Sequence, residues 1–555
     1  MPAGRLSRAL AAFALACASL AGSVVLTEAI FRFYERRFLI EEVRIGADDF
    51  DLAKLHYNDG EGFVAAAKPE GTFRILSFGD SFAESATRAR YAYAEVLARN
   101  LTEASGHPVR VVNLGVSKTT FQDYLLEERT WGERVAHDAV LFNLYAGNDF
   151  AEVPQYALFA PGMVAGPVRK GSEEVRLVGP GIDVPHRYPL RLLDYAWAQY
   201  LTHTEAASED EDAERYRPRM PMAPRKYYVR TQAAMSRYYG PEPLEPVYGG
   251  SLYGLYALVS SAVALERGGM RVALTVAPPD FAVSRAWFDA VLTERGLDET
   301  DLRLDLPEQV VSALARRRGF AGPIIVFHEC LREAEARGQR TYYKTNTHWS
   351  VRGNEIVGRV LAERLAAAWD LGAGRVPAGD PPPPCPSDPP PINADVERWL
   401  DASLPRLEAA TRLRNQIGAA LAGEGLGSFG AVAEALTRAG LRHEPERIAG
   451  RIESASSDGV GRVPVHLRGV VRDARDPRSW LLVAVLRGRE LRGIGLTPLE
   501  GALPGAAEGA FAFDVVDDVT DPLWGKRALA VAIAPDGAFA ELPVEVRTLL
   551  GGSAD

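Results

Sequence analysis

Ser81 and His348 are the residues of this chain whose types and surroundings best suit nucleophilic catalysis. Ser81 follows the short apolar segment "RILSFGD", and His348 lies within "YYKTNTHWS". A serine hydroxyl is a weak nucleophile until a base removes its proton, and histidine is the usual base because its pKa lies close to neutral pH. A Gly-Asp-Ser triplet is also an ordinary turn sequence. The chemistry therefore depends on which other residues the fold places beside Ser81.

Two further polar positions follow apolar segments in the same way. Gly115 ends "VVNLG", and Asn148 follows "AVLFNLYAG". The carboxyl ends of parallel strands meet at one edge of a sheet, so we expect these residues near Ser81. The backbone N–H groups of Ser81 and Gly115 and the side-chain amide of Asn148 would then supply three donors for an oxyanion.

This pattern resembles the SGNH (GDSL-type) hydrolase superfamily over roughly residues 70 to 370. The four blocks of that family occur here in order, as "GDS" at 79–81, the glycine of "NLGVS", "AGND" at 146–149 and the histidine of "NTHW". The resemblance implies an ester-cleaving or acyl-transferring enzyme that uses no metal or other cofactor. Its implied roles are Ser81 as nucleophile, His348 as base, and Ser81, Gly115 and Asn148 as the oxyanion hole.

One position departs from the family pattern. The family usually has an aspartate three residues before the histidine, and glycan O-acetyltransferase relatives have it two before, as D-x-H-W. Thr345 and Asn346 occupy these positions here. Asn346 would accept the Nδ1 hydrogen bond of His348 and hold its tautomer, but it supplies no negative charge, and loss of the aspartate in a serine-protease triad lowers turnover about ten-thousand-fold. Three alternatives follow: a Ser-His dyad assisted by Asn346, a carboxylate recruited from elsewhere such as Glu329, or an enzyme of little activity.

Three neighbouring polar residues have simpler interpretations. We expect Asp80 and Asp149 to hold their loops by hydrogen bonds. We expect His328 to pack or hydrogen-bond at the end of its strand.

Apolar, β-branched segments alternate with helix-compatible segments from about residue 73 to residue 369. This alternation predicts an α/β fold with three layers, in which helices cover both faces of a parallel sheet. A long segment at about 151–245, rich in Pro, Tyr and Arg, interrupts the alternation. We expect an insertion there, which either is a solvated loop or walls the site.

The composition changes along the chain predict five parts. They are an N-terminal transmembrane anchor (1–37), the α/β domain (38–372), a proline-rich linker (373–393), a helical segment (394–445) and a small β-sandwich (446–550). The sandwich is predicted because short alternating strands separated by Gly, Asp and Pro are typical of that architecture.

The anchor is predicted from the uncharged segment 9–26, which is close to the roughly twenty apolar residues that span a bilayer. No clear signal-cleavage site follows it. We therefore expect the chain to stay attached to a membrane of the bacterial cell envelope, with its catalytic domain outside the cytoplasm. The three cysteines, Cys17, Cys330 and Cys385, form no zinc-type cluster, and export would allow Cys330 and Cys385 to pair.

The composition also bears on partners. A net charge of -10 and the lack of a basic stripe argue against a nucleic-acid partner. The expected function is a membrane-anchored serine esterase acting on O-acyl or O-acetyl esters, with an acylated polysaccharide as a candidate substrate. The alternatives are a glycan O-acyltransferase and an SGNH-fold binding or scaffold protein of low activity.

Overall fold

The structure is a computed structural model of the 555-residue chain. It describes residues 3–35, 37, 41–45, 68–87, 91–115, 119–132, 135–150, 156–157, 174–178, 188–197, 225–371, 389–421, 429–446, 449–457, 464–472, 480–487, 490–498, 510–516, 526–534 and 537–542.

A five-stranded parallel sheet forms the centre of the α/β unit, as the sequence predicts. Its order is β3-β2-β4-β7-β8. The strands are β2 (Phe73–Gly79), β3 (Val109–Asn113), β4 (Ala139–Tyr145), β7 (Arg271–Ala277) and β8 (Ile324–Val326). Every residue of β4 is buried. Such continuous apolar strands require cover on both faces of the sheet.

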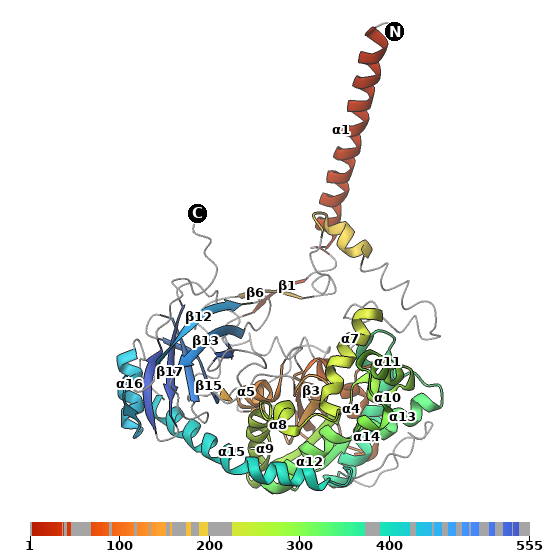
Figure 1. Cartoon of the computed structure of the whole chain (residues 1–555). Coiled ribbons are helices and arrows are strands. Elements are labelled where there is room, and N and C mark those ends of the chain that lie inside the picture. Colours follow the sequence, from red (N-terminus) through yellow and green to blue (C-terminus); the bar gives the residue numbers. More distant parts are fainter. Residues whose placement is uncertain are drawn as a thin grey trace.

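Side chains alternate between two hydrophobic cores, one on each face of the sheet. Leu76 and Phe78 of β2 belong to one core, and Ile75 belongs to the other. The helices of the first core include α5 (Phe121–Gly132), α9 (Leu252–Arg267) and α12 (Leu306–Arg318). Those of the second are α4 (Tyr93–Ser105), α13 (His328–Ala336) and α14 (Val351–Ala368). The three layers predicted from the sequence are therefore present (Figure 1).

Several short elements complete the α/β unit near the ends of its strands. They are α3 (Ser81–Glu84), α10 (Asp280–Val283), α11 (Arg285–Arg295), η4 (Glu299–Asp301), β9 (Tyr342–Tyr343) and β10 (Asn346–Trp349). The last two strands pair as an antiparallel hairpin just before α14.

The predicted insertion is described in parts. Strand β6 (Glu174–Val178) pairs antiparallel with β1 (Glu41–Ile45). Residues 188–190 lead into a short helix at 191–197. After it come α7 (Arg225–Met235), η3 (Ser236–Tyr239) and α8 (Leu244–Tyr248). The acidic run at 205–214 lies outside the described residues.

The C-terminal part consists of two helices followed by strands in two sheets. The helices are α15 (Ala394–Leu421) and α16 (Phe429–Arg438). The strands are β11 (Arg442–His443), β12 (Ala449–Ser457), β13 (Pro464–Arg472), β14 (Trp480–Arg487), β15 (Glu490–Pro498), β16 (Ala510–Val516), β17 (Lys526–Ile533) and β18 (Ala538–Leu542). One sheet has the order β12-β13-β16, and the other has the order β11-β18-β17-β14-β15-β5.

The second sheet includes a strand that the sequence did not predict. Strand β5 (Tyr156–Ala157) comes from the insertion, and it pairs with Leu496 and Gly495 of β15. The C-terminal β unit is therefore completed by a segment that lies more than three hundred residues before β15 in the chain.

The chain begins with the long helix α1 (Ala3–Tyr34), which projects from the rest of the molecule (Figure 1). Its segment Ala12–Tyr34 is long and apolar enough to cross a membrane, and a signal sequence has the same properties. Cys17 in this helix is a free thiol, whereas Cys330 is disulfide-bonded. Cys385, which export would allow to pair with Cys330, lies outside the described residues.

Candidate active site

Ser81 occupies the first position of helix α3, directly after strand β2. The Asp80 side chain caps this helix, because its Oδ1 accepts the N–H of Phe82 at 2.8 Å. The half-buried Ser81 side chain donates from Oγ to Oδ2 of Asp80 at 3.4 Å. Asp80 thus holds its loop, as the sequence predicts.

Gly115 packs directly against the backbone of α3. A β-carbon at this position would lie 2.2 Å from the backbone nitrogen of Glu84, so only glycine fits. The Asn113 side chain joins the two segments, since it donates from Nδ2 to the carbonyl of Ala83 at 2.6 Å and accepts the Gly115 N–H at 3.1 Å. Gly115 is therefore close to α3, and its N–H has an internal partner in this structure.

The third block forms a turn after strand β4. Asp149 holds this turn, because its Oδ2 accepts the N–H of Tyr145 and the hydroxyl of Tyr124, both at 2.8 Å. The neighbouring Asn148 has a buried Oδ1 with no hydrogen-bond partner among the described residues. Asp149 has the structural role that the sequence predicts.

His348 lies on a bulge of the β9–β10 hairpin. Asn346 pairs with Tyr343 and Trp349 pairs with Tyr342, so Thr347 and His348 are extra residues on β10. Bulges of this kind change the direction of side chains and are frequent beside active sites. The aromatic ring of Phe82, next to Ser81 in the chain, lies 5.0 Å from the imidazole between ring centroids. The fold therefore brings the histidine block to α3, the helix that carries Ser81.

Asn346 fixes the tautomer of His348. Its Oδ1 lies 2.5 Å from Nδ1 of the imidazole and also accepts the His348 backbone N–H at 3.1 Å. Because an amide oxygen only accepts, Nδ1 carries the proton and Nε2 has the free lone pair that a base needs. This is the contact that the sequence predicts for Asn346.

The environment of His348 keeps the imidazole neutral. Burial lowers its pKa to about 4, since a charged ring would lose its hydration. Nε2 has no hydrogen-bond partner among the described residues, so the Ser81 hydroxyl is not bonded to it in this structure.

The carboxylate considered as a substitute acid has other contacts. Glu329 lies 3.7 Å from Nδ1 of His328 and 3.7 Å from Nη1 of Arg332. His328 is buried, and its Nε2 lies 3.1 Å from the carbonyl oxygen of Ala282, so it hydrogen-bonds near its strand end as predicted. Asn346, and not Glu329, contacts Nδ1 of His348.

Sequence reasoning missed a second group of polar residues beside the imidazole. The hydroxyl of Thr347 lies 2.7 Å from the hydroxyl of Tyr145 and accepts from Nε2 of Gln232 at 3.2 Å. Tyr145 also stacks on Phe82, with 3.9 Å between ring centroids. Tyr145 is the last residue of β4, so the argument from strand ends that indicated Asn148 could also have indicated Tyr145. Gln232 lies in the insertion and has no comparable signal. Its hydrogen bond places this part of the insertion beside Thr347, the residue before His348.

Comparisons with known proteins gave results for solved structures alone. No family model matches the chain, and no curated protein matches it. The acetylxylan esterase Axe2 from Geobacillus stearothermophilus is 15% identical with a TM-score of 0.24, covering 55% of this chain and 96% of that protein. TesA is 12% identical with a TM-score of 0.25, covering 53% and 99%. A protein described as lipolytic and of the G-D-S-L family, from Desulfitobacterium hafniense DCB-2, is 12% identical with a TM-score of 0.23, covering 52% and 98%. Each of these matches covers about half of this chain and nearly all of the matched protein.

Proposed function

We propose that the chain is a membrane-attached serine esterase that cleaves O-acyl esters, with acetyl groups on extracytoplasmic glycans as the candidate substrate. The observation that carries the proposal is the state of His348. This residue is neutral, is protonated on Nδ1 by its contact with Asn346, and lies beside the helix that begins with Ser81.

The reaction would proceed by acyl transfer to Ser81. Nε2 of His348 takes the hydroxyl proton while Oγ attacks the ester carbonyl, and the same proton then passes to the departing alkoxide. Water, activated by His348 in the same way, releases the acid and restores the serine. The Ser81 hydroxyl donates to Asp80 in this structure, so the first step requires it to turn towards Nε2 of His348. Catalytic hydrogen bonds of this kind often form only when substrate is bound.

Three donors would stabilise the oxyanion. They are the N–H of Ser81 at the start of α3, the side-chain amide of Asn148 and the N–H of Gly115. The last would have to be shared with Asn113, its present acceptor at 3.1 Å.

Two observations support the location of the enzyme. Helix α1 meets the length and composition of a membrane span. The disulfide at Cys330 is typical of an oxidising compartment outside the cytoplasm. A cleaved signal sequence is the alternative for α1. The mass of the protein purified from expressing cells decides between the two, because cleavage would remove the mass of α1.

A binding or scaffold protein of low activity is the second candidate. It is favoured by Asn346, which provides no charge to stabilise an imidazolium. An O-acyltransferase would use the same residues with a sugar hydroxyl in place of water.

Labelling with a fluorophosphonate probe tests the proposal. We expect the wild type to be labelled and Ser81→Ala to remain unlabelled. Equal labelling of both, or none of the folded wild type, would contradict a serine nucleophile at this position. Acetate release from acetylated glycans, measured with and without an acceptor sugar, then separates hydrolysis from transfer.

A further inference from the structure

The short helix at 191–197 buries charged side chains and exposes apolar ones, which is the reverse of a helix on a water-exposed surface. Arg191 and Asp194 face inwards, and each is only 3% exposed. Leu193, Ala196 and Trp197 face outwards at the i, i+3, i+4 spacing of one helix face, with Leu193 45% and Trp197 39% exposed. A helix on a water-soluble surface normally presents the opposite arrangement.

The end of helix α1 shows the same reversal. Glu28 and Glu35 are buried, and Phe31 packs edge-on against Tyr195 of the short helix with 4.9 Å between ring centroids. The exposed residues of the same turns include Ile30, Phe33 and Tyr34, together with the charged Arg32. The two helices therefore enclose two glutamates, an arginine and an aspartate between them, and apart from Arg32 the large side chains that they expose are apolar.

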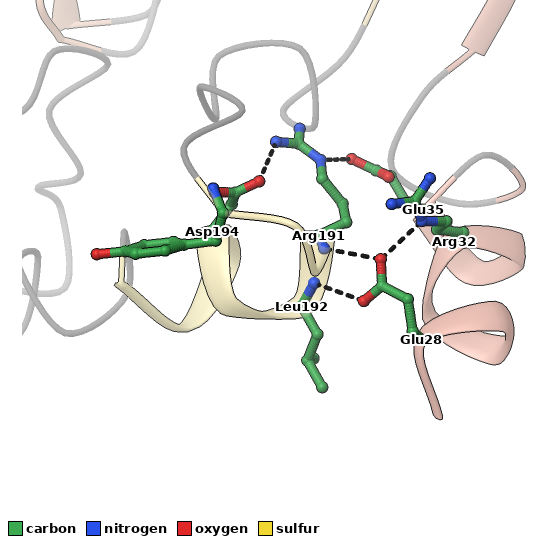
Figure 2. Close-up of polar contacts among 7 residues, drawn as sticks. Glu28, Arg32, Glu35, Arg191, Leu192 and Asp194 are labelled. Carbon is green, nitrogen blue, oxygen red and sulfur yellow. Dashed lines mark hydrogen bonds and ion pairs between the residues drawn. The ribbon is translucent and has the colours of Figure 1, made fainter. Parts of the chain in front are cut away.

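Hydrogen bonds join the two helices through these enclosed charges (Figure 2). The Glu28 carboxylate accepts the backbone N–H groups of Arg191 at 2.7 Å and Leu192 at 3.1 Å, as well as Nε of Arg32 at 2.6 Å. Arg191 donates from Nε to Oε1 of Glu35 at 2.7 Å, and its Nη1 lies 3.4 Å from Oδ2 of Asp194.

This junction fixes the short helix against α1. Glu28 caps the first turn of 191–197 from another segment of the chain, and a carboxylate is favourable beside the positive end of a helix. Because the charges are buried and paired, separating the helices would leave them without partners, which is costly in an apolar environment.

We infer that residues 188–197 and the end of α1 together form a membrane-interface element, in which Leu193 and Trp197 enter the headgroup region of a phospholipid bilayer. This inference rests on the proposed membrane attachment of α1. The helix at 191–197 is hydrogen-bonded to the end of α1, where Ile30, Phe33 and Tyr34 are also exposed. The exposed Tyr188 and Trp197 are residue types enriched in the headgroup region. Interfacial helices of this type present an apolar face to the lipid.

The element gives the chain a second contact with the bilayer besides the span itself. The insertion that carries it also supplies Gln232, which contacts Thr347 next to His348. The bilayer would thereby restrain the insertion that carries Gln232.

Depth-dependent quenching of a fluorophore tests the inference on the full-length protein in vesicles of phosphatidylcholine and phosphatidylglycerol. The Leu193→Cys variant, made in a Cys17→Ser background, carries an environment-sensitive label, and the bilayer contains a lipid with a quencher near the headgroup. Trp197→Cys is a second site. Ala402→Cys, on the exposed face of α15, is the control, and native Cys17 labelled in the wild type reports whether α1 is inserted.

We expect labels at 193 and 197 to be quenched about threefold more strongly than the label at 402, and to be shielded from aqueous iodide. If the label at Cys17 is buried in lipid while those at 193 and 197 behave like the label at 402, the interface element is refuted but the anchor stands. If the label at Cys17 is also exposed to water, the proposed membrane attachment is itself wrong.

The junction has its own test. Arg191→Gln added to the Leu193→Cys variant should reduce quenching of the label at 193, because residue 191 loses its ion pair with Glu35. Arg191→Gln added to the wild type should leave the signal of the label at Cys17 unchanged. Arg230→Gln, whose partner Glu294 lies on the surface at 3.7 Å, is the matched control. Unchanged quenching in Arg191→Gln would refute the assigned role of the junction.

Discussion

At the scale of residues, the main feature of the candidate site is an amide in the place of an acid. Asn346 performs the orienting part of the role of an aspartate, since it holds Nδ1 of His348 at 2.5 Å. It does not perform the electrostatic part, and burial therefore lowers the pKa of His348 to about 4 with no opposing charge. A base with so low a pKa is unprotonated at neutral pH but accepts a proton weakly.

Asn346→Asp should raise the pKa of His348 towards its ordinary value near 6.5, because a carboxylate stabilises the imidazolium. In the wild type, kcat/KM should not fall until the pH approaches about 4, where the base becomes protonated. In the variant the acid limb should move to higher pH, and the neutral-pH rate with p-nitrophenyl acetate should rise by at least about tenfold. An unchanged pH–rate profile would contradict the assignment of His348 as the base, and Ser81→Ala in the same background is the control.

Asp80 gives a prediction on stability. Burial raises the pKa of its carboxyl from 3.8 to about 7, so the folded state retains a proton that the unfolded state releases near pH 4. The contribution of this carboxyl to the free energy of unfolding is fully favourable below about pH 4, and it is lost as the pH rises through 7. Asp80→Asn keeps an oxygen to accept the Phe82 N–H and removes this loss.

The expected gain for Asp80→Asn in the free energy of unfolding is on the order of 4 kcal/mol at most above pH 7, and close to zero near pH 4. Urea unfolding at both pH values measures it. A gain of the same size at both would show that the carboxyl is not responsible.

At the scale of elements, side-chain hydrogen bonds and close backbone contacts position the candidate site. Helix α3 is positioned by the cap of Asp80, by the close approach of Gly115 and by the Asn113 side chain between them. The β9–β10 bulge then brings His348 to the same helix. The insertion adds Gln232 from α7.

Gly115→Ala should therefore disrupt the site. Its β-carbon would lie 2.2 Å from the Glu84 nitrogen and 2.5 Å from the Ala83 carbonyl carbon, so the backbone of α3 must move. We expect a loss of roughly 3 kcal/mol or more in the free energy of unfolding and loss of probe labelling at Ser81. Gly254→Ala in α9 is the matched control, because its nearest contact is 3.3 Å away on the flexible side chain of Gln122. Equal behaviour of the two variants would contradict the packing argument.

At the scale of the whole molecule, the α/β domain, the helical segment after it and the C-terminal strands share one core. The core on the α12 face of the sheet continues through Leu400 and Leu407 of α15 to Leu482 of β14 and Val531 of β17. Two ion pairs also join α15 to the α/β unit. Nη1 of Arg303 lies 2.6 Å from Oδ2 of Asp395, and Nε of Arg317 lies 2.9 Å from Oδ1 of Asp401. The helix following the proline-rich segment therefore packs as part of the α/β unit.

The disulfide at Cys330 gives a prediction at this scale. Cys330 is fully buried in the core on the α14 face, and Cys330→Ala should lower the free energy of unfolding by about 2–4 kcal/mol. Dithiothreitol should lower the Tm of the wild type but not that of the variant. Cys17→Ala, at the exposed free thiol, should change neither. If Cys385 is the partner, Cys385→Ala will reproduce the loss, and a Cys385→Ala variant that retains the wild-type Tm would contradict this pairing.

The sequence by itself determined the features that depend on local patterns. Continuous apolar segments predicted the strands of the parallel sheet, and polar residues directly after them predicted that Ser81, Gly115 and Asn148 would lie at strand ends. The uncharged N-terminal segment likewise predicted α1. These predictions succeed because the periodicity of side chains and the preferences of turns are properties of neighbouring residues.

The tertiary structure decided everything that depends on contacts between distant segments. The low pKa of His348 arises from burial by Phe82 and other residues far from it in the chain, and β5 joins a sheet whose other strands lie near the C-terminus. The reversed polarity of 191–197 is visible only once α1 covers its charged face. Burial and pairing are set by the packing of the whole chain, so no local pattern of residues specifies them.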